Sequence, residues 1–275
     1  AGVAEITNQM EYDDEVAFHA NRRIFDHGRY ERDTPLCLVV SFTHPHDPYA
    51  ARRRFWDLYS DADIDMPAVP PIPYAELDPH SRRLWDVSAM DDYDVTPEDV
   101  RSSRHGYYAN ISYLDSKVGE LLDTLETCGM RERTAVVLTA DHGDFLGERG
   151  LWYKMSFLEP SARVPLILHW PERFAPRRVR EPASLADIAP TLAALAGRTE
   201  IETDGSSLLA HAEGSSEART VHGEYLAEGV VAPMFMIRRG RWKFVRCRTD
   251  PDQLFDLDAD PHELRNLAAD PAHAA

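Results

Sequence analysis

The chain has 275 residues, of which 43% are hydrophobic and 28% are charged, and its formal net charge at pH 7 is −17. This composition is typical of a globular protein and excludes a disordered or fibrous one, and the length allows one large domain with a smaller appendage. The acidic balance argues against a nucleic-acid-binding surface, which needs a basic stripe, and against polyanionic substrates unless the site is locally basic.

The N-terminal part of the chain predicts a helix followed by a buried strand. Apolar side chains recur at four-residue steps over residues 12–27, which is the spacing of one helical face. Residues 36–42, L-C-L-V-V-S-F, form a continuous apolar run typical of a strand that is covered on both faces. Prolines in the following T-H-P-H-D-P-Y, residues 43–49, end that strand and fix a loop that carries two histidines.

Residues 50–99 show little periodicity, and their prolines exclude long regular elements. A stretch of this length inside a compact domain usually forms a functional loop or a cover over a site. A long helix is expected over residues 101–128, where apolar residues recur at three- and four-residue steps and Gly129 ends the pattern.

Two strands and a helix are expected next, over residues 134–140, 163–170 and 184–196. Ser184 and Asp187 form a capping-box pattern at the start of that helix. Because helices and strands alternate along the chain, we expect an α/β fold with a largely parallel sheet and helices on its faces.

The last part of the chain predicts a small antiparallel subdomain. Arg239 and Gly240 favour a tight turn between two short strands. We therefore predict a first domain over residues 1–197 and a second over residues 198–275. The strands expected in the second domain cover residues 221–226, 234–239, 241–246 and 252–257, and a short helical turn is expected over residues 262–267.

The stretch with the most candidate functional side chains follows the strand expected at residues 134–140. Asp141 and His142 are both able to ligate a metal, since a carboxylate suits Ca²⁺ or Mg²⁺ and an imidazole also suits zinc or manganese. Adjacent residues of a strand point to opposite faces, so joint use requires the chain to turn there, and Gly143 makes a turn easy. The alternative is that Asp141 caps a turn and His142 is a surface residue. The pair alone cannot complete an oxygen-rich shell of about six ligands.

Three further side chains are candidates for contact with an anion. Lys154 lies among apolar neighbours and is able to neutralise a bound oxyanion or a leaving oxygen; a solvated loop lysine is the alternative. His44 and His46 are candidates for metal ligands, general acids or anion donors, and loop histidines bonded to the backbone are the alternative. No serine, threonine or cysteine of the sequence stands in a convincing nucleophile context.

The cysteines and the apolar runs indicate the cellular compartment of the protein. Cys37, Cys128 and Cys247 are widely spaced and odd in number, which favours reduced thiols in a cytosolic compartment over a disulfide framework. No apolar run approaches the length of a membrane span, about eighteen residues. The first residues have no signal-peptide pattern, and they also lack an initiator methionine. We expect a cytoplasmic protein with no membrane partner, and a chain that is an internal portion of a longer one.

Several motifs together resemble the central and C-terminal parts of a type I sulfatase of the alkaline phosphatase superfamily. The resemblance covers almost the whole chain and implies an alkaline-phosphatase-like fold. The motifs at residues 41–49 and 138–154 are most similar in sequence to those of the choline sulfatases. The motifs are S-F-T-H-P-H-D-P-Y at residues 41–49, R-H-G-Y-Y-A-N-I-S-Y-L-D-S-K-V-G at 104–119, L-T-A-D-H-G-D-F-L-G-E-R-G-L-W-Y-K at 138–154, S-A-R-V-P-L-I-L-H at 161–169 and Q-L-F-D-L-D-A-D-P-H-E-L-R-N-L-A at 253–268.

The resemblance also implies roles for individual residues. Asp141 and His142 would be two ligands of one divalent cation, Ca²⁺ in the first place or else Mg²⁺ or Mn²⁺. Lys154 and His46 would contact the sulfate oxygens and the departing oxygen, and His44 is a neighbouring substrate-site residue of open role. The family signature Cys or Ser-x-Pro-x-Arg, whose cysteine becomes formylglycine, is absent from this chain, as are the early paired aspartates. The nucleophile is therefore expected outside this chain, in a full-length enzyme that is a homo-oligomer.

The implied substrate is a small sulfate ester, choline O-sulfate first, hydrolysed to choline and sulfate. A trimethylammonium group needs aromatic faces and a carboxylate, for which Glu224 and Glu228 are the candidates. One alternative is a phosphonate monoester or phosphodiester hydrolase on the same scaffold. Another is a truncated, non-catalytic copy that keeps only the fold.

Overall fold

The computed structural model describes residues 1–198 and 201–273. The chain forms two compact units, each built from two separate stretches of sequence. Unit 1 comprises residues 1–68 and 94–134, and unit 2 comprises residues 69–93 and 135–275. The predicted boundary at residue 197 lies inside unit 2, and the division into residues 1–197 and 198–275 stays a prediction. Residues 199–200 and 274–275 of the predicted second domain lie outside the described residues.

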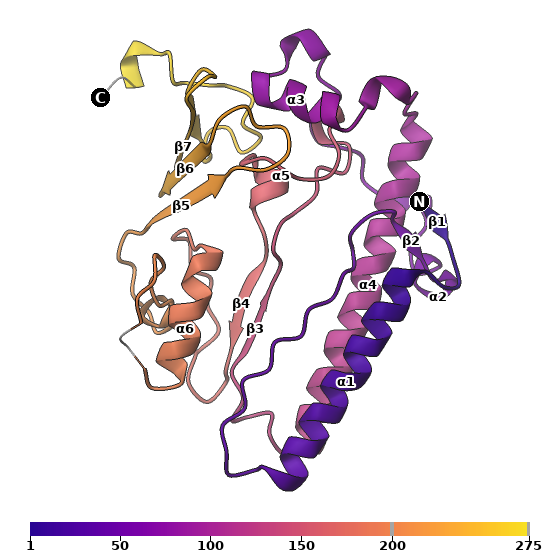
Figure 1. The fold of residues 1–275 in the computed structure, drawn as a ribbon, viewed down its shortest axis with the longest axis vertical. Coiled ribbons are helices and arrows are strands. Elements are labelled where there is room, and N and C mark those ends of the chain that lie inside the picture. Colours follow the sequence, from indigo (N-terminus) through magenta and orange to yellow (C-terminus); the bar gives the residue numbers. More distant parts are fainter. Residues whose placement is uncertain (199–200, 274–275) are drawn as a thin grey trace. The chain divides into compact units, whose positions relative to one another are not determined.

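Two long helices that lie side by side form the frame of unit 1 (Figure 1). They are α1 (Asn8–Tyr30) and α4 (Pro97–Thr127). Phe55, Ala109 and Tyr113 belong to the hydrophobic core of this unit. Its remaining elements are β1 (Gly2–Val3) and β2 (Ala50–Ala51), which pair in parallel, the short helix α2 (Arg53–Trp56) and the 3-10 helix η1 (Asp61–Asp63).

Both long helices begin at capping residues. The predicted helix at residues 12–27 is confirmed as α1, which starts earlier because the Thr7 hydroxyl accepts a hydrogen bond from the backbone N–H of Met10 at 3.2 Å. The predicted helix at residues 101–128 is confirmed as α4. It starts at Pro97 because Thr96 and Asp99 form a capping box and proline suits the first helical position.

The apolar run at residues 36–42 is not a strand in the part of the chain that the structure describes. Its predicted coverage on both faces is also wrong, because Val39 is 80% exposed and Leu38 is 38% exposed. A strand satisfies its backbone N–H and C=O groups by pairing with a neighbour, and no strand of the described residues pairs with this run. Its apolar, β-branched composition alone does not create a sheet.

Unit 2 begins its sheet structure with β3 (Val136–Thr139) and β4 (Leu166–His169), which confirm two predicted strands. They pair antiparallel, with Thr139 opposite Leu166, so the expectation of largely parallel pairing is wrong for this pair. A parallel neighbour needs a crossover that returns the chain to the starting end of the first strand. Residues 140–165 instead contain the 3-10 helix η4 (Glu148–Gly150) and the four-residue helix α5 (Glu159–Ala162), and they re-enter at the end they left.

The C-terminal strands confirm the predicted antiparallel subdomain. Within the described residues they form one sheet in the order β5-β6-β7-β8, with every pair antiparallel. Gly240 makes the tight turn between β6 and β7 with a φ of 54°. The predicted helical turn at residues 262–267 is absent, because Glu263 has a φ of 54° and a left-handed residue cannot continue a right-handed helix. The strands are β5 (Thr220–Tyr225), β6 (Met234–Arg239), β7 (Trp242–Cys247) and β8 (Gln253–Asp256).

A hydrophobic core of unit 2 joins Leu84 of α3 and Phe255 of β8 to Phe145 and Leu151, whose side chains are fully buried. The predicted capping box of Ser184 and Asp187 is confirmed, and it starts the 3-10 helix η5 that leads into α6. The other elements are η2 (Tyr74–Glu76), α3 (Pro79–Val87), η3 (Met90–Asp92), η5 (Leu185–Asp187), α6 (Ile188–Leu195), α7 (Leu209–Ala212) and η6 (Pro271–His273).

Two global expectations can be compared with the described residues. None of their helices combines the length and the apolar character that crossing a bilayer requires. Cys37, Cys128 and Cys247 are all free thiols, as the sequence predicts, and only Cys247 is buried.

Candidate active site

The Asp-His pair lies just beyond the end of β3, where the chain leaves the strand. The Asp141 side chain is 85% exposed and that of His142 is 33% exposed, and their Oδ2 and Nε2 atoms are 3.7 Å apart. Asp141 Oδ1 also accepts a hydrogen bond from the backbone N–H of His142 at 2.9 Å. Both side chains therefore lie on one side of the turn, as joint use of the pair requires.

The ring of His142 is held in a definite tautomer. Its Nδ1 is 2.8 Å from the backbone oxygen of Gly143, and because a carbonyl only accepts, Nδ1 carries the proton. In a neutral ring Nε2 then carries a lone pair, which is the arrangement of metal-ligating histidines whose second nitrogen donates to the backbone. The donor set of Asp141 and His142 fits two positions of a divalent cation. Among residues 1–198 and 201–273 no larger group of His, Cys, Asp and Glu side chains gathers for this purpose.

Gly143 lets the Asp-His turn pass against another backbone segment. Its N–H donates to the backbone oxygen of Ser161 at 2.7 Å, and a Cβ on Gly143 would lie 2.1 Å from the backbone oxygen of Pro160. A backbone oxygen cannot rotate away as a side chain can. A residue with a Cβ would therefore separate these two segments.

A Gly143→Ala variant is expected to lose about 1 to 3 kcal/mol of unfolding free energy, because the added methyl group overpacks a rigid contact. Gly119→Ala is the matched control: it lies inside α4, and a Cβ there meets no atom within 4 Å. Alanine is the better helix former, so the control is expected to gain about 0.5 to 1 kcal/mol. Urea unfolding of the chain and both variants measures the difference, and equal stabilities for the two variants would contradict the close contact at Gly143.

The segment that leads to Lys154 is held in an unusual backbone path. Leu146, Arg149, Tyr153 and Met155 all have positive φ between 46° and 64°, a conformation that costs energy for residues other than glycine. Such strain persists only where the surroundings over-determine the path. Here the N–H of fully buried Phe145 donates to the Tyr153 oxygen at 2.7 Å.

Lys154 itself is half-buried between two left-handed residues, Tyr153 and Met155. The Nε2 of His80 on α3 is 2.6 Å from the backbone oxygen of Met155. Burial lowers the pKa of His80, so its ring is neutral at pH 7, with the proton on Nε2 donated to that oxygen. The backbone on both sides of Lys154 is therefore fixed, and sequence reasoning missed His80 because it is distant in the chain.

The two carboxylates that are candidates for binding a cationic head group, Glu224 and Glu228, have different surroundings in the structure. Tyr225, on β5, donates its hydroxyl to Glu228 Oε2 at 3.2 Å, and the ring of Tyr225 lies edge-on to His80 at 6.3 Å. Glu228 is thus connected through two side chains to the Lys154 segment. Glu224 is exposed and lies on the face of β5 opposite to Tyr225, because alternate residues of a strand face opposite sides.

The candidate histidines lie in unit 1, whereas Asp141, His142, Lys154 and both glutamates lie in unit 2. His46 is partly exposed, with 38% of its side chain accessible, and its Nδ1 is 2.8 Å from Asp47 Oδ1. The His44 side chain is fully buried, with Nδ1 2.6 Å from Asp13 Oδ2. Asp13 was missed by the sequence reading, because a lone aspartate on a helix gives no signal of its partner 31 residues later.

Asp14, next to Asp13, belongs to a separate cluster. Its carboxylate accepts hydrogen bonds from Arg52 at 2.5 Å and Tyr113 at 2.9 Å, and its Oδ1 is 3.0 Å from Lys117 Nζ. Burial alone would raise its pKa, but the side chains of Arg52, Lys117 and Tyr113 together lower the pKa of Asp14 to about 2.

We expect the stability that Asp14 contributes to be pH-dependent in one direction. A carboxyl group with a lowered pKa in the folded state stabilises above its unfolded pKa, about 4, and this contribution is lost as the pH falls toward about 2. Asp14→Asn should therefore destabilise unit 1 at neutral pH and differ progressively less from the original chain in urea unfolding below about pH 4. The exposed Asp123→Asn on α4 is the control. A difference in unfolding free energy between Asp14→Asn and the original chain that stays constant down to pH 2 would refute the pairing of Asp14 with its cationic neighbours.

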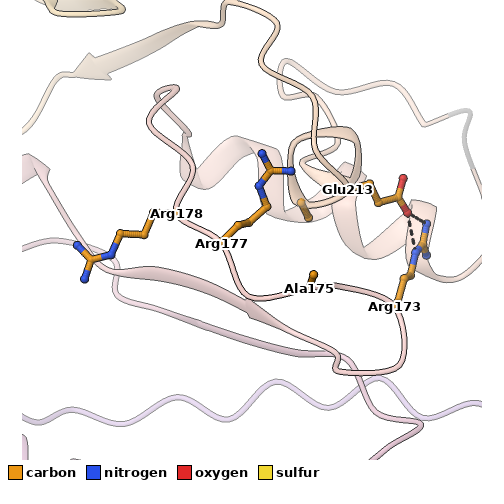
Figure 2. Close-up of a pocket in the computed structure, with 6 residues that line it drawn as sticks. Arg173, Ala175, Arg177, Arg178 and Glu213 are labelled. Carbon is orange, nitrogen blue, oxygen red and sulfur yellow. Dashed lines mark hydrogen bonds and ion pairs between the residues drawn. The ribbon is translucent and has the colours of Figure 1, made fainter.

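Unit 2 also has an open surface pocket. Its volume is about 370 Å³, and Arg173, Arg177, Arg178 and Glu213 line it together with two alanines. Figure 2 shows Glu213 already paired with Arg173, at 2.6 Å, and Arg178 directed away from the pair. None of the candidate catalytic or metal-ligating residues lines this pocket, so it is not the candidate active site.

Comparison with solved structures defines the class of fold. The chain superposes with a TM-score of 0.74 on the phosphonate monoester hydrolase of Agrobacterium radiobacter, at 26% identity over 95% of this chain and 58% of that one. It superposes with a TM-score of 0.76 on a 2-O GAG sulfatase, at 23% identity over 98% of this chain and 61% of that one. The fold is therefore the alkaline-phosphatase-like α/β fold that the sequence predicts.

The chain belongs to the sulfatase family, because the sulfatase family model matches residues 3–198. The model of the C-terminal part of N-sulphoglucosamine sulphohydrolase matches residues 147–275. Choline-sulfatase of Rhizobium meliloti is 54% identical over 98% of this chain and 54% of its own length. Arylsulfatase K of Bos taurus is 33% identical over 63% of this chain and 35% of its own length. The chain thus spans about half or less of these curated relatives.

Proposed function

We propose that this chain is part of a sulfuric ester hydrolase that converts choline O-sulfate to choline and sulfate. The observation that carries the proposal is the 54% identity to choline-sulfatase of Rhizobium meliloti over 98% of the chain. The acidic net charge of −17 supports a small substrate without net charge over a sulfated polysaccharide.

Two residues are proposed to act on the sulfate group. The ammonium group of Lys154 donates to sulfate oxygens, where its charge stabilises the oxyanion as negative charge develops. His46 delivers a proton to the ester oxygen as the sulfur–oxygen bond breaks, so that the departing oxygen leaves as the neutral hydroxyl group of choline and not as an alkoxide. The pairing of His46 Nδ1 with Asp47 at 2.8 Å supports this role, because the contact holds Nδ1 and directs Nε2 away from Asp47.

Asp141 and His142 are proposed as two ligands of one divalent cation, Ca²⁺ first as the family resemblance implies, or else Mg²⁺ or Mn²⁺; a carboxylate suits such hard ions. When bound, the cation neutralises charge on the sulfate oxygens. The remaining ligands and the formylglycine nucleophile are expected outside this chain. Calcium titration of the longer enzyme, compared with its Asp141→Asn variant, tests the ligand assignment.

Glu228 is proposed to face the trimethylammonium group of choline, in preference to Glu224. Its contact with Tyr225 supports the choice, since a quaternary ammonium is recognised by an aromatic face together with a carboxylate. The resemblance implies that His44 is a substrate-site residue, although its side chain is fully buried.

A cytosolic location and a homo-oligomeric full-length enzyme belong to the same proposal. The free thiols of Cys37, Cys128 and Cys247 support a reducing compartment. Light scattering of the full-length enzyme tests the oligomeric state.

The phosphonate monoester hydrolase of Agrobacterium radiobacter supports a second candidate reaction on the same scaffold. Both candidates are tested with the enzyme that joins this chain to a nucleophile-bearing N-terminal segment. Sulfate release from choline O-sulfate, with slow cleavage of a phosphonate monoester, supports the proposal. The reverse preference favours the second candidate, and no turnover of either substrate by a preparation that contains formylglycine favours the non-catalytic alternative.

A further inference from the structure

The Asp13 carboxylate on α1 collects three hydrogen bonds from the loop at residues 43–49. It accepts from the backbone N–H of Thr43 at 2.7 Å, from the backbone N–H of His44 at 3.0 Å and from His44 Nδ1 at 2.6 Å. Asp13 has no exposed surface. Burial by itself would raise its pKa, but these hydrogen bonds together hold the pKa of Asp13 below its usual range. The carboxylate is therefore charged at neutral pH and fully occupied by this loop.

A second residue of α1 holds the other end of the same loop. Gln9 lies one helical turn before Asp13, on the same face, and its Nε2 donates to the backbone oxygen of Asp47 at 2.6 Å. On the side of α4, a Cβ at Gly106 would lie 2.1 Å from the backbone oxygen of Tyr49, so the loop passes directly against that helix. The segment that carries His46 is thus fixed at both ends by contacts within unit 1.

The ring of His44 faces inward. Its side chain has no exposed surface, and it packs edge-on against Tyr113 with ring centroids 5.0 Å apart. Its Nε2 is buried and has no hydrogen-bond partner among the described residues. A side chain enclosed in this way is poorly placed to touch a substrate, whereas His46, two residues later, is partly exposed.

We propose that Asp13 and His44 form a buried positioning pair, which fixes the backbone of residues 43–47 so that His46 presents its ring to the ester oxygen. The inference rests on the proposed role of His46. It reassigns His44 from substrate contact to positioning, and it adds Asp13, which no comparison or motif had singled out.

The first experiment replaces Asp13 with asparagine in the enzyme that contains the nucleophile segment. Asparagine offers one accepting oxygen where Asp13 offers two, so its NH₂ group must oppose either the Thr43 N–H or the donors of His44, and we expect the loop and the His44 ring to shift, visible in the ¹⁵N shifts of its two nitrogens. We expect kcat to fall about tenfold or more with KM changed by less than about threefold. A displaced catalytic group lowers the rate of the chemical step more than it weakens substrate binding.

Asp14→Asn is the matched control, because Asp14 is adjacent on α1 and pairs with Arg52, Lys117 and Tyr113 instead of the loop. We expect it to leave the His44 tautomer unchanged and kcat within about twofold, since the hydrogen bonds of its carboxylate go to Arg52, Tyr113 and Lys117 and not to residues 43–49. If Asp13→Asn behaves like Asp14→Asn in both measurements, the positioning role is wrong.

The second experiment separates the two nitrogens of His44. In His44→Asn the amide N–H is able to replace Nδ1–H toward Asp13, while in His44→Gln it reaches the position of Nε2. We expect the asparagine variant to keep most of kcat and the glutamine variant to lose as much as Asp13→Asn. The opposite order would show that Nε2 acts directly and would overturn the proposal.

The proposed function can fail independently of the positioning pair. A His46→Ala variant with unchanged kcat would remove the proposed role of His46. The tautomer of His44 and the ring shifts of His46 in Asp13→Asn are measurable on the 275-residue chain alone, without activity. Unchanged His46 shifts in that variant would contradict positioning whatever reaction the enzyme catalyses.

Discussion

Replacing Lys154 with alanine is expected to lower kcat by about 10² to 10³-fold, which is the usual effect of removing one preorganised oxyanion donor. The reason lies in the backbone around the lysine. Tyr153 and Met155, on either side, are held in left-handed conformations, and His80 fixes the Met155 oxygen at 2.6 Å. A group that is fixed before the reaction stabilises developing charge without reorganisation.

Steady-state kinetics of the enzyme that contains the nucleophile segment, with choline O-sulfate as substrate, measures this effect. Arg163→Ala is the matched control, because Arg163 is an exposed cation of the same unit and has no candidate role. A Lys154→Ala variant with the kcat of the Arg163→Ala control would remove Lys154 from the mechanism. The path of the segment should persist in both variants, since Phe145 and Leu151 anchor it in the core.

Elements whose signals are local could be predicted from the sequence. The body of α4 was predicted over residues 101–128 from its apolar spacing, and the strand β6 was predicted with its observed bounds, Met234–Arg239. Gly240 marked its turn because only a left-handed residue fits there. In each case the deciding interactions lie within a few residues of one another.

Pairing and coverage could not be predicted in the same way. The run at residues 36–42 has the composition of a central strand, yet strand structure also depends on a neighbour that composition does not specify. The antiparallel pairing of β3 and β4 depends on where residues 140–165 return, which periodicity does not encode.

The residue types of the candidate site could be predicted from the sequence, but the buried residues that hold its loops in place could be predicted only in part. The stretch that ends at Lys154 was recognisable because its chemistry is contiguous in sequence. The buried partners Asp13 and His80 were not, since each acts on a loop 30 or more residues away. Left-handed Leu146 was also unforeseen, because the strain is permitted by tertiary contacts rather than by the residue type.

One buried cluster joins the C-terminal part of unit 2 to the segment after Lys154. Lys243 on β7 is 1% exposed and donates to the Phe157 oxygen at 2.7 Å. Its Nζ lies 2.6 Å from Glu159 Oε1 and 2.7 Å from Glu263 Oε1. Glu263 also accepts from the backbone N–H of Glu159 at 2.7 Å. Arg238 Nη1 also lies 3.3 Å from Glu159 Oε1, so the partly buried Glu159 faces two cations, while Lys243 is the cation paired with the buried carboxylate of Glu263.

Lys243→Met is expected to cost about 3 to 5 kcal/mol of unfolding free energy, because removing one partner leaves uncompensated charge in the interior. The loss should depend on pH. Burial raises the pKa of Glu263, and Lys243 opposes that rise, so without the lysine the carboxyl group becomes harder still to ionise. A group with a raised folded pKa destabilises once the pH exceeds its unfolded value, so the variant should lose further stability from about pH 5 to about pH 8.

Urea unfolding at both pH values measures the effect, with Arg265→Met as the control. Arg265 is 78% exposed and lies 3.9 Å from Asp270, so its removal should cost less than about 1 kcal/mol. Adding Glu263→Gln to Lys243→Met should restore part of the lost stability, because the second change removes the charge that the first left unbalanced. A double variant no more stable than Lys243→Met at pH 8 would show that the lysine acts through packing alone. The charge balance at this cluster would then not be what holds the C-terminal sheet against the segment that follows Lys154.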